Sequence, residues 1–268
     1  MKKNSLLLAA ILVTAIACKK STTTTRGPGV GTTQSTTVTN GFGTAGTNNI
    51  NGVLYAQRLN ISASGLNVVQ YQAGATFSKT AKPLSGLYAQ LGIPLNGEQA
   101  GVLKLDSTIL KYNYTNANSN INTYSDTTTN SVYNSAKWSV GGNTNFTAFT
   151  TTVTRGYPVM TNTSYLPTTF SKSQPLTINF GSNNYSNTDS LIVLITDNGS
   201  TTNFFVYKYV AGNASSVTFT AAELSAASTT SSPEIVVYAK NYSSSSNGGK
   251  NYVFVLENDL VNYVTITP

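Results

Sequence analysis

The chain has 268 residues, only 9% of which are charged, and its formal net charge at pH 7 is +7. A typical globular domain has about 25% charged residues, so the solubility of this chain depends on hydroxyl and amide groups instead. The sequence contains no histidine and one cysteine. These two counts exclude Ser–His and Cys–His catalytic pairs, the commonest zinc ligand and a disulfide within the chain.

Residues 1–17 have the form of a bacterial signal peptide. Lys2 and Lys3 precede an apolar run, Leu6–Ile16, whose length of about 11 residues suits a signal peptide and is roughly half of what spans a bilayer. The run ends in Ala15-Ile16-Ala17-Cys18, which resembles the lipobox of bacterial lipoproteins. We therefore predict that Cys18 is lipidated. The alternative is simple secretion, which would leave Cys18 as a free thiol.

Residues 18–50 are predicted to be a disordered tether that begins with the lipidated cysteine. The sequence there is dominated by Thr, Gly and Asn and offers almost nothing that could be buried. About 31 residues of coil reach roughly 30 Å on average. The tether would therefore hold the folded domain away from the membrane.

Basic residues are scattered along the rest of the chain. Loss of Lys2 and Lys3 with the signal peptide would leave 14 basic and 9 acidic groups. These Lys and Arg residues form no run or stripe, whereas binding to a phosphate backbone requires one. No nucleic-acid partner is expected.

The region from Asn51 onward has the pattern of an all-β protein. Apolar and aromatic runs alternate with Asn-Gly, Gly-Gly and Ser-rich loops at spacings of roughly 8–15 residues. We predict an immunoglobulin-like β-sandwich, built as one large domain or as two lobes at 51–145 and 146–268 that meet at Gly141-Gly142-Asn143. The expected strands are Val53–Arg58, Leu66–Gln72, Gly101–Leu105, Ile109–Tyr114, Ala136–Val140, Phe146–Val153, Leu176–Phe180, Ser190–Thr196, Phe204–Val210, Ser216–Thr220, Glu234–Lys240, Tyr252–Leu256 and Leu260–Thr267.

Four segments of the second half predict specific local structure. Leu191–Ile195 is apolar on both faces, so it should lie in the middle of a sheet that is covered on both sides. Phe204–Val210 alternates like a half-buried strand, and Asp197-Asn198-Gly199 before it has the chemistry of a tight hairpin turn. Thr220-Ala221-Ala222-Glu223 matches a capping box that begins a short helix, with Leu224 in the core.

Several phrases resemble the uncharacterised lipoproteins of Bacteroidota. The resemblance rests on Cys18-Lys19-Lys20 after the short signal, on the Thr/Gly tether, and on Trp138-Ser139-Val140-Gly141-Gly142 and Ser216–Leu224. It implies a lipid-anchored, all-β exported protein of the outer membrane and brings no assigned activity. Surface-displayed members usually carry acidic residues just after the lipidated cysteine, whereas lysines follow it here. The periplasmic face and the cell surface are therefore both retained as locations.

Carboxylates are the only side chains left for acid–base catalysis, and the chain has nine. Glu223 and Asp197 are explained by the cap and the turn. Glu257-Asn258-Asp259 interrupts two apolar runs and indicates a solvated hairpin turn, with a calcium site on that loop as the alternative. Glu98 and Glu234 lack a firm local role, but their spacing does not predict the facing pair that a glycosidase needs. We expect no enzymatic activity, no metal and no cofactor.

Three aspartates precede a hydroxyl residue in a manner similar to the O-glycosylation motif of Bacteroidota: Asp106-Ser107-Thr108, Asp126-Thr127-Thr128 and Asp189-Ser190-Leu191. Up to about one such match is expected by chance in a chain this rich in Ser and Thr. Ser107, Thr127 and Ser190 are the candidate sites, and Thr127 has the most polar surroundings.

Most of the 16 Tyr and 10 Phe occupy strand positions, where core packing explains them. The single tryptophan, Trp138, is expected in the core rather than in a sugar-binding platform. Tyr112, Tyr114, Tyr124 and Tyr133 occur in a stretch rich in Asn, Ser and Thr that cannot bury all four rings. These four tyrosines form the candidate ligand surface.

The sequence thus predicts a lipid-anchored cell-envelope protein with a non-catalytic role in binding, adhesion or structure. Its predicted partners are the membrane, through the lipid on Cys18, and a glycan or another envelope protein. The first alternative is a glycan-binding accessory lipoprotein of a polysaccharide-uptake system, which exposed tyrosine pairs in a groove would favour. The second is a hydrolase that uses carboxylates alone, which two carboxylates about 5–10 Å apart in a cleft would favour.

Overall fold

The computed structural model describes residues 50–63, 66–82, 97–114, 122–126, 136–159, 165–180, 185, 188–197, 204–229 and 233–268. In these ranges the chain forms one sheet of 11 strands, two sheets of two strands each, and a four-residue helix, α3 (Ala221–Leu224). The prediction of an all-β fold is confirmed. The predicted signal peptide and the tether up to residue 49, including Cys18, lie outside the described residues.

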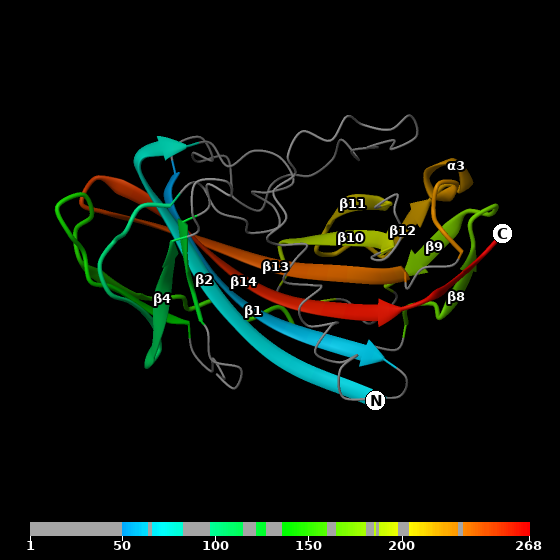
Figure 1. The fold of residues 1–268 in the computed structure, drawn as a ribbon, viewed down its shortest axis with the longest axis horizontal. Helices are drawn as coiled ribbons and strands as arrows, with labels where there is room; N and C mark the ends of the chain where they lie inside the picture. The colour runs from blue at the N-terminus through cyan, green and yellow to red at the C-terminus, as the bar shows by residue number, and fades with distance from the viewer. Residues whose placement is uncertain are drawn as a thin grey trace.

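The strands of the large sheet follow the order β11-β10-β13-β14-β1-β2-β5-β4-β3-β6-β7. All neighbouring pairs are antiparallel except β1 (Ile50–Ala63) and β14 (Lys250–Tyr263), which run parallel to each other. Figure 1 shows β13, β14, β1 and β2 as long, curved ribbons that lie side by side. The other strands of this sheet are β2 (Leu66–Lys82), β3 (Leu103–Leu105), β4 (Thr108–Tyr114), β5 (Asn122–Ser125), β6 (Lys137–Val140), β7 (Phe149–Thr152), β10 (Ser190–Asp197), β11 (Phe205–Ala211) and β13 (Pro233–Asn247).

Side chains of successive residues point to opposite faces of the sheet. The first face, which carries Leu256 and Leu260 of β14, has two apolar cores. One core contains Leu260 and is completed by α3 and by the two small sheets (Figure 1). Those sheets pair β9 (Leu176–Asn179) with β12 (Ser216–Phe219), and β8 (Thr169–Ser171) with β15 (Thr265–Thr267).

The second core of the first face contains Leu256 together with the fully buried Trp138 of β6. β6 and β14 are far apart in the strand order, so the sheet must curl until its β3–β7 end packs over β1, β2 and β14. This burial confirms Trp138 as a core residue. The arrangement is sandwich-like. That the sandwich is of the immunoglobulin type, and that it divides into two lobes, remain predictions.

A short segment, residues 155–158, crosses the first face between these two cores. The Asn241 amide donates to the Gly156 carbonyl at 2.6 Å, and the Asn258 amide donates to the Pro158 carbonyl at 2.8 Å. Asn258 lies between Leu256 and Leu260 in β14, at the boundary between the cores. The buried asparagines therefore satisfy two backbone carbonyl groups of this segment.

The second face carries Val255 and Val261 of β14. Two apolar clusters lie on it: one contains Leu59, Val236 and Val261, and the other contains Val53, Tyr242 and Val255. Between these clusters in β14 stand Glu257 and Asp259.

The turn predicted at Glu257-Asn258-Asp259 is wrong, because all three residues lie inside β14. The tight turn that joins β13 to β14 is Gly248-Gly249, and both glycines have left-handed φ values, 57° and 72°. Such values suit a two-residue hairpin loop, and glycine adopts them without steric penalty. The three residues are also buried, so the alternative of a calcium site on a solvated loop is wrong as well.

Several local predictions are confirmed. β10 lies between β11 and β13, and Leu191–Ile195 is at most 5% exposed at every position. The Thr220–Glu223 capping box forms with both of its reciprocal hydrogen bonds, and Leu224 is fully buried. β10 and β11 pair antiparallel as a hairpin requires, while Asn198 and Gly199 of the predicted turn lie outside the described residues.

Candidate functional site

The most unusual chemistry of the molecule is a buried charge cluster on the second face, formed by Gln57, Lys240, Glu257 and Asp259. Lys240 and Asp259 are fully buried, and Glu257 is 4% exposed. Lys240 of β13 and Gln57 of β1 are the cross-strand partners of Glu257 in β14. Three adjacent strands therefore place a cation, a carboxylate and an amide in one row.

The contacts inside the cluster are short. Lys240 Nζ lies 2.5 Å from Glu257 Oε2, but it is not aligned for a hydrogen bond with any described group. The Gln57 amide donates to Glu257 Oε1 at 3.1 Å and also to Asp259 Oδ2. Asp259 Oδ1 has no hydrogen-bond partner among the described residues. One amide thus bridges two carboxyl groups that share a single cation.

Burial sets the protonation of this cluster. Burial, the Glu257 charge and a hydrogen bond with Glu257 raise the pKa of Asp259 well above its usual range. Burial has the largest single effect on Lys240 and acts to lower its pKa, but Glu257, Tyr242 and Asp259 together outweigh burial, so the pKa of Lys240 is raised. The raised pKa values favour the protonated forms of both Asp259 and Lys240.

The predicted ligand surface of four tyrosines does not form as a set. Tyr124 is 3% exposed and its hydroxyl bonds to Ala100 N and Gly101 O, so its assignment to an exposed surface is wrong. Tyr112 is half-buried, packs on Tyr124 at a ring-centroid distance of 5.1 Å, and donates to the Gly97 carbonyl. Tyr114 belongs to β4, and Tyr133 lies outside the described residues.

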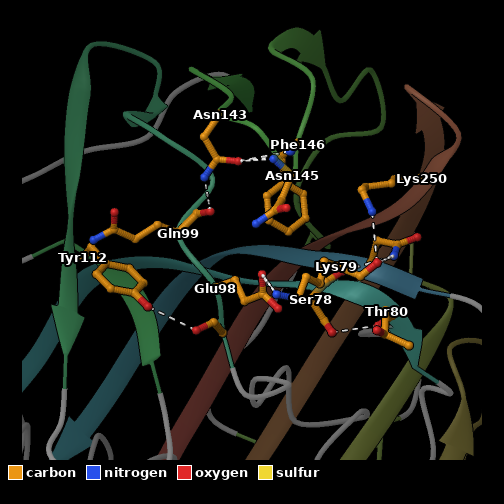
Figure 2. A network of polar contacts seen from close by, with 12 residues as sticks. Ser78, Lys79, Thr80, Glu98, Gln99, Tyr112, Asn143, Asn145, Phe146 and Lys250 are labelled. Carbon is orange, nitrogen blue, oxygen red and sulfur yellow. Dashed lines mark hydrogen bonds and ion pairs between the residues drawn. The ribbon is translucent and has the colours of Figure 1, made fainter.

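Glu98, one of the two carboxylates without a firm sequence-level role, lies in a polar network beside β2 (Figure 2). Its backbone N–H donates to the Phe77 carbonyl at 2.7 Å, and its carboxylate lies 3.8 Å from Lys79 Nζ. The Asn143 side-chain amide donates to the backbone carbonyl of Gln99, the residue after Glu98, at 2.5 Å. Since the Lys79 side chain is 61% exposed, solvent weakens its pairing with Glu98.

Glu98 and Glu234 do not face each other. Phe77, beside Glu98, lies level with Tyr252 in the strand register, whereas Glu234 pairs with Tyr263. From Tyr252 to Tyr263, β14 covers roughly 35 Å at about 3.3 Å per residue. Glu234 is 1% exposed. Burial of the Tyr263 hydroxyl, together with its hydrogen bond to Glu234, raises the pKa of Tyr263 to about 12.

Two further carboxylates are engaged in structural contacts. The Glu223 carboxylate accepts the Thr220 N–H at 2.7 Å and pairs with Lys208 Nζ at 3.0 Å. Asp189 binds Arg155 Nη1 through both oxygens, at 2.6 and 2.7 Å, and also accepts the Tyr242 N–H.

The three candidate glycosylation sites differ in accessibility. Ser107 is exposed in the two-residue turn between β3 and β4, where Asp106 has a left-handed φ of 53°. Ser190 is 5% exposed at the start of β10, and its hydroxyl donates to Tyr242 Oη. Thr127 lies outside the described residues. In the folded protein, a transferase could reach Ser107 but not Ser190.

A second group of aromatic side chains, which the sequence did not indicate as a site, lies on β11. Phe205 and Tyr207 lie two residues apart on β11, at one edge of the large sheet, with their rings parallel to within 8°. Phe205 is 38% exposed, whereas Tyr209 on the same face is buried. The alternation of this strand was predicted, but the exposure of its first ring depends on the edge position of β11.

The fold and these clusters define an all-β protein built on one large, curled sheet with a buried ionic row. No protein-family model matches the chain, and neither the curated proteins nor the solved structures contain a match. Within the described ranges, no helix has the length and apolar character needed to cross a membrane, and no three His, Cys, Asp or Glu side chains gather as a metal site.

Proposed function

We propose that the chain is a lipid-anchored cell-envelope protein with a non-catalytic role in binding, adhesion or structure. The anchor is argued from the signal-like segment that ends at Cys18. The observation that carries the non-catalytic role is how the carboxylates are used. Glu223 caps a helix, Asp189 holds Arg155, and Asp259, whose pKa is raised, is fully buried.

A hydrolase that uses carboxylates needs two of them across an accessible cleft, about 5–10 Å apart. Glu257 and Asp259 are close enough, but at 4% and 0% exposure they do not face solvent. Glu98 and Glu234, the two carboxylates to which the sequence assigns no local role, lie level with opposite ends of β14. This geometry favours a structural or binding role.

The glycan-binding alternative is favoured by a different observation, the parallel rings of Phe205 and Tyr207 at the sheet edge. Exposed aromatic rings offer an apolar face with which a sugar ring can make contact. In this alternative the β11 edge replaces the Tyr112 region as the ligand surface, because Tyr124 there is buried.

The anchor is tested by substituting Cys18→Ala in a bacterial host. The variant should move from the membrane fraction to the soluble fraction and lose labelling by a fatty-acid analogue. Unchanged membrane association with no label in either protein would overturn the lipoprotein assignment.

The role is tested on the soluble Cys18→Ala protein with a screen of polysaccharides, peptides and esters. No turnover is expected, and turnover that disappears in Glu98→Gln or Glu234→Gln would establish the hydrolase instead. Retention on a polysaccharide column that Phe205→Ala abolishes would favour the glycan binder. Ile109→Ala, which removes another exposed apolar side chain (58% exposed), is the matched control.

A further inference from the structure

The buried charge cluster contains the components of an amide-forming reaction. Lys240 supplies a primary amine, Glu257 supplies a carboxyl group 2.5 Å away, and Asp259 supplies a second carboxyl group hydrogen-bonded to the first. Of the described lysines, only Lys240 is fully buried. Nothing in the proposed envelope role requires this arrangement.

We propose that Lys240 Nζ and Glu257 Cδ form an intramolecular amide bond that joins β13 to β14, with the Asp259 carboxyl group as the acid. The bond is a modification of the chain on itself, and it requires no cofactor, oxidant or added reactant.

The short Lys240–Glu257 contact supports this reaction. Cross-strand pairing holds the two residues opposite each other, so their side chains meet without a search through solvent. Nζ is 2.5 Å from a carboxylate oxygen without being aligned for a hydrogen bond. The amine and the carboxyl group that would react are therefore already in contact.

The surroundings of the cluster exclude water, which favours a neutral amide over a separate ammonium and carboxylate. Val255 and Tyr242 on one side of the cluster and Val261 and Val236 on the other belong to buried apolar clusters. In such surroundings a neutral amine and a neutral acid lose less solvation than an ammonium and a carboxylate. Water is the product of the condensation, so its exclusion also opposes the reverse reaction.

The condensation releases one water and needs only protons that the cluster already holds. The pair rests as ammonium and carboxylate, since Glu257 raises the pKa of Lys240, and a proton first passes from Nζ to the Glu257 carboxylate. The neutral Nζ attacks Cδ, and the Nζ–Cδ bond forms. Asp259 donates its proton to the departing oxygen, the Cδ–O bond breaks and one water leaves. Nζ returns a proton to Asp259, so the acid is regenerated.

Denaturing mass spectrometry of the full chain tests the proposal, with Cys18→Ala as background so that no lipid adds mass. The loss of one water should make the chain about 18 Da lighter than its sequence. Trypsin cuts after Lys and Arg, but an amide at Lys240 blocks cleavage there. The digest should therefore contain residues 209–250 joined to residues 251–268 as one branched peptide.

Three variants locate the bond. Lys240→Met should have the full sequence mass, and Asp259→Asn, which keeps both reacting groups, should accumulate the unlinked form. Lys250→Arg removes another lysine from the same hairpin and should still lose water. A link as complete in Asp259→Asn as in the parent would refute the role of Asp259.

The parent protein decides the main proposal even if a variant fails to fold. A full sequence mass, with cleavage after Lys240 and a free 251–268 peptide, overturns the crosslink. A water loss that persists in Lys240→Met also overturns it, because the loss would then arise elsewhere.

Discussion

Removing the cation of the buried charge cluster should destabilise the protein more than removing the cation together with its partner. Lys240→Met leaves the Glu257 carboxylate inside the sheet, 4% exposed and without its ammonium. The double variant Lys240→Met/Glu257→Leu removes both charges and puts two apolar side chains in their place. Neither variant can form the proposed amide, so the amide does not contribute to the difference between them.

The magnitude follows from the burial of the pair. Removing one member of a buried ion pair lowers the free energy of unfolding by about 3–5 kcal/mol, because the other charge stays buried without a partner. Replacing both members with apolar groups is often neutral or stabilising. The double variant should therefore be more stable than Lys240→Met by about 3–5 kcal/mol. For a domain of roughly 200 residues this corresponds to a difference in Tm on the order of 10 °C.

Urea unfolding at pH 7, followed by far-UV circular dichroism, measures this difference as a shift in midpoint at an unchanged m value. Equal midpoints for the two variants at pH 7, or a less stable double variant, would refute the reasoning that Glu257 is a charge in a dry site.

Two further predictions concern the core and the surface. Trp138→Ala should lower the free energy of unfolding by about 3–5 kcal/mol, because a fully buried indole is lost. Trp138→Phe should lower it by less than half as much, because the indole N–H has no acceptor among the described residues. Equal losses for the two variants in urea unfolding would contradict this. Protein from a glycosylating native host should carry added mass that peptide mapping places on Ser107 and that Ser107→Ala removes, whereas modification of the folded protein at the buried Ser190 would contradict the accessibility argument.

Features encoded by neighbouring residues could be predicted from the sequence. The Thr220–Glu223 capping box needs only three residues of spacing, and its contacts form as expected. The apolar run Leu191–Ile195 requires cover on both faces whatever supplies it, and the run is buried throughout. In both cases the physical cause lies within the segment itself.

Features that depend on distant partners were missed. Charges in an apolar run suggest a turn, because burying an unpaired charge is costly, and Glu257 was interpreted in that way. Its partner was nevertheless readable in the chain, since Lys240 stands eight residues before Gly248 and Glu257 stands eight residues after Gly249. Counting outward from the Gly-Gly pair would have paired the two charges.

The burial of Tyr124 depends on still more distant residues. Its ring packs edge-on against Phe77 at 5.7 Å, and its hydroxyl bonds to the backbone of Ala100 and Gly101. The Asn- and Thr-rich stretch around this tyrosine suggests solvent exposure, and only the curl of the sheet reverses that expectation.

The parallel pairing of β1 with β14 imposes an order on how the protein can be made. Gly52 lies beside Tyr252, so the two strands are separated by 200 residues of chain. At a synthesis rate of about 5–20 residues per second, β1 leaves the ribosome roughly 10 to 40 s before the strand that covers its edge. Through that interval the β1–β2 hairpin has an open edge of the kind that pairs with other chains. Completion of the large sheet is therefore a late event that waits for the last strands of the chain.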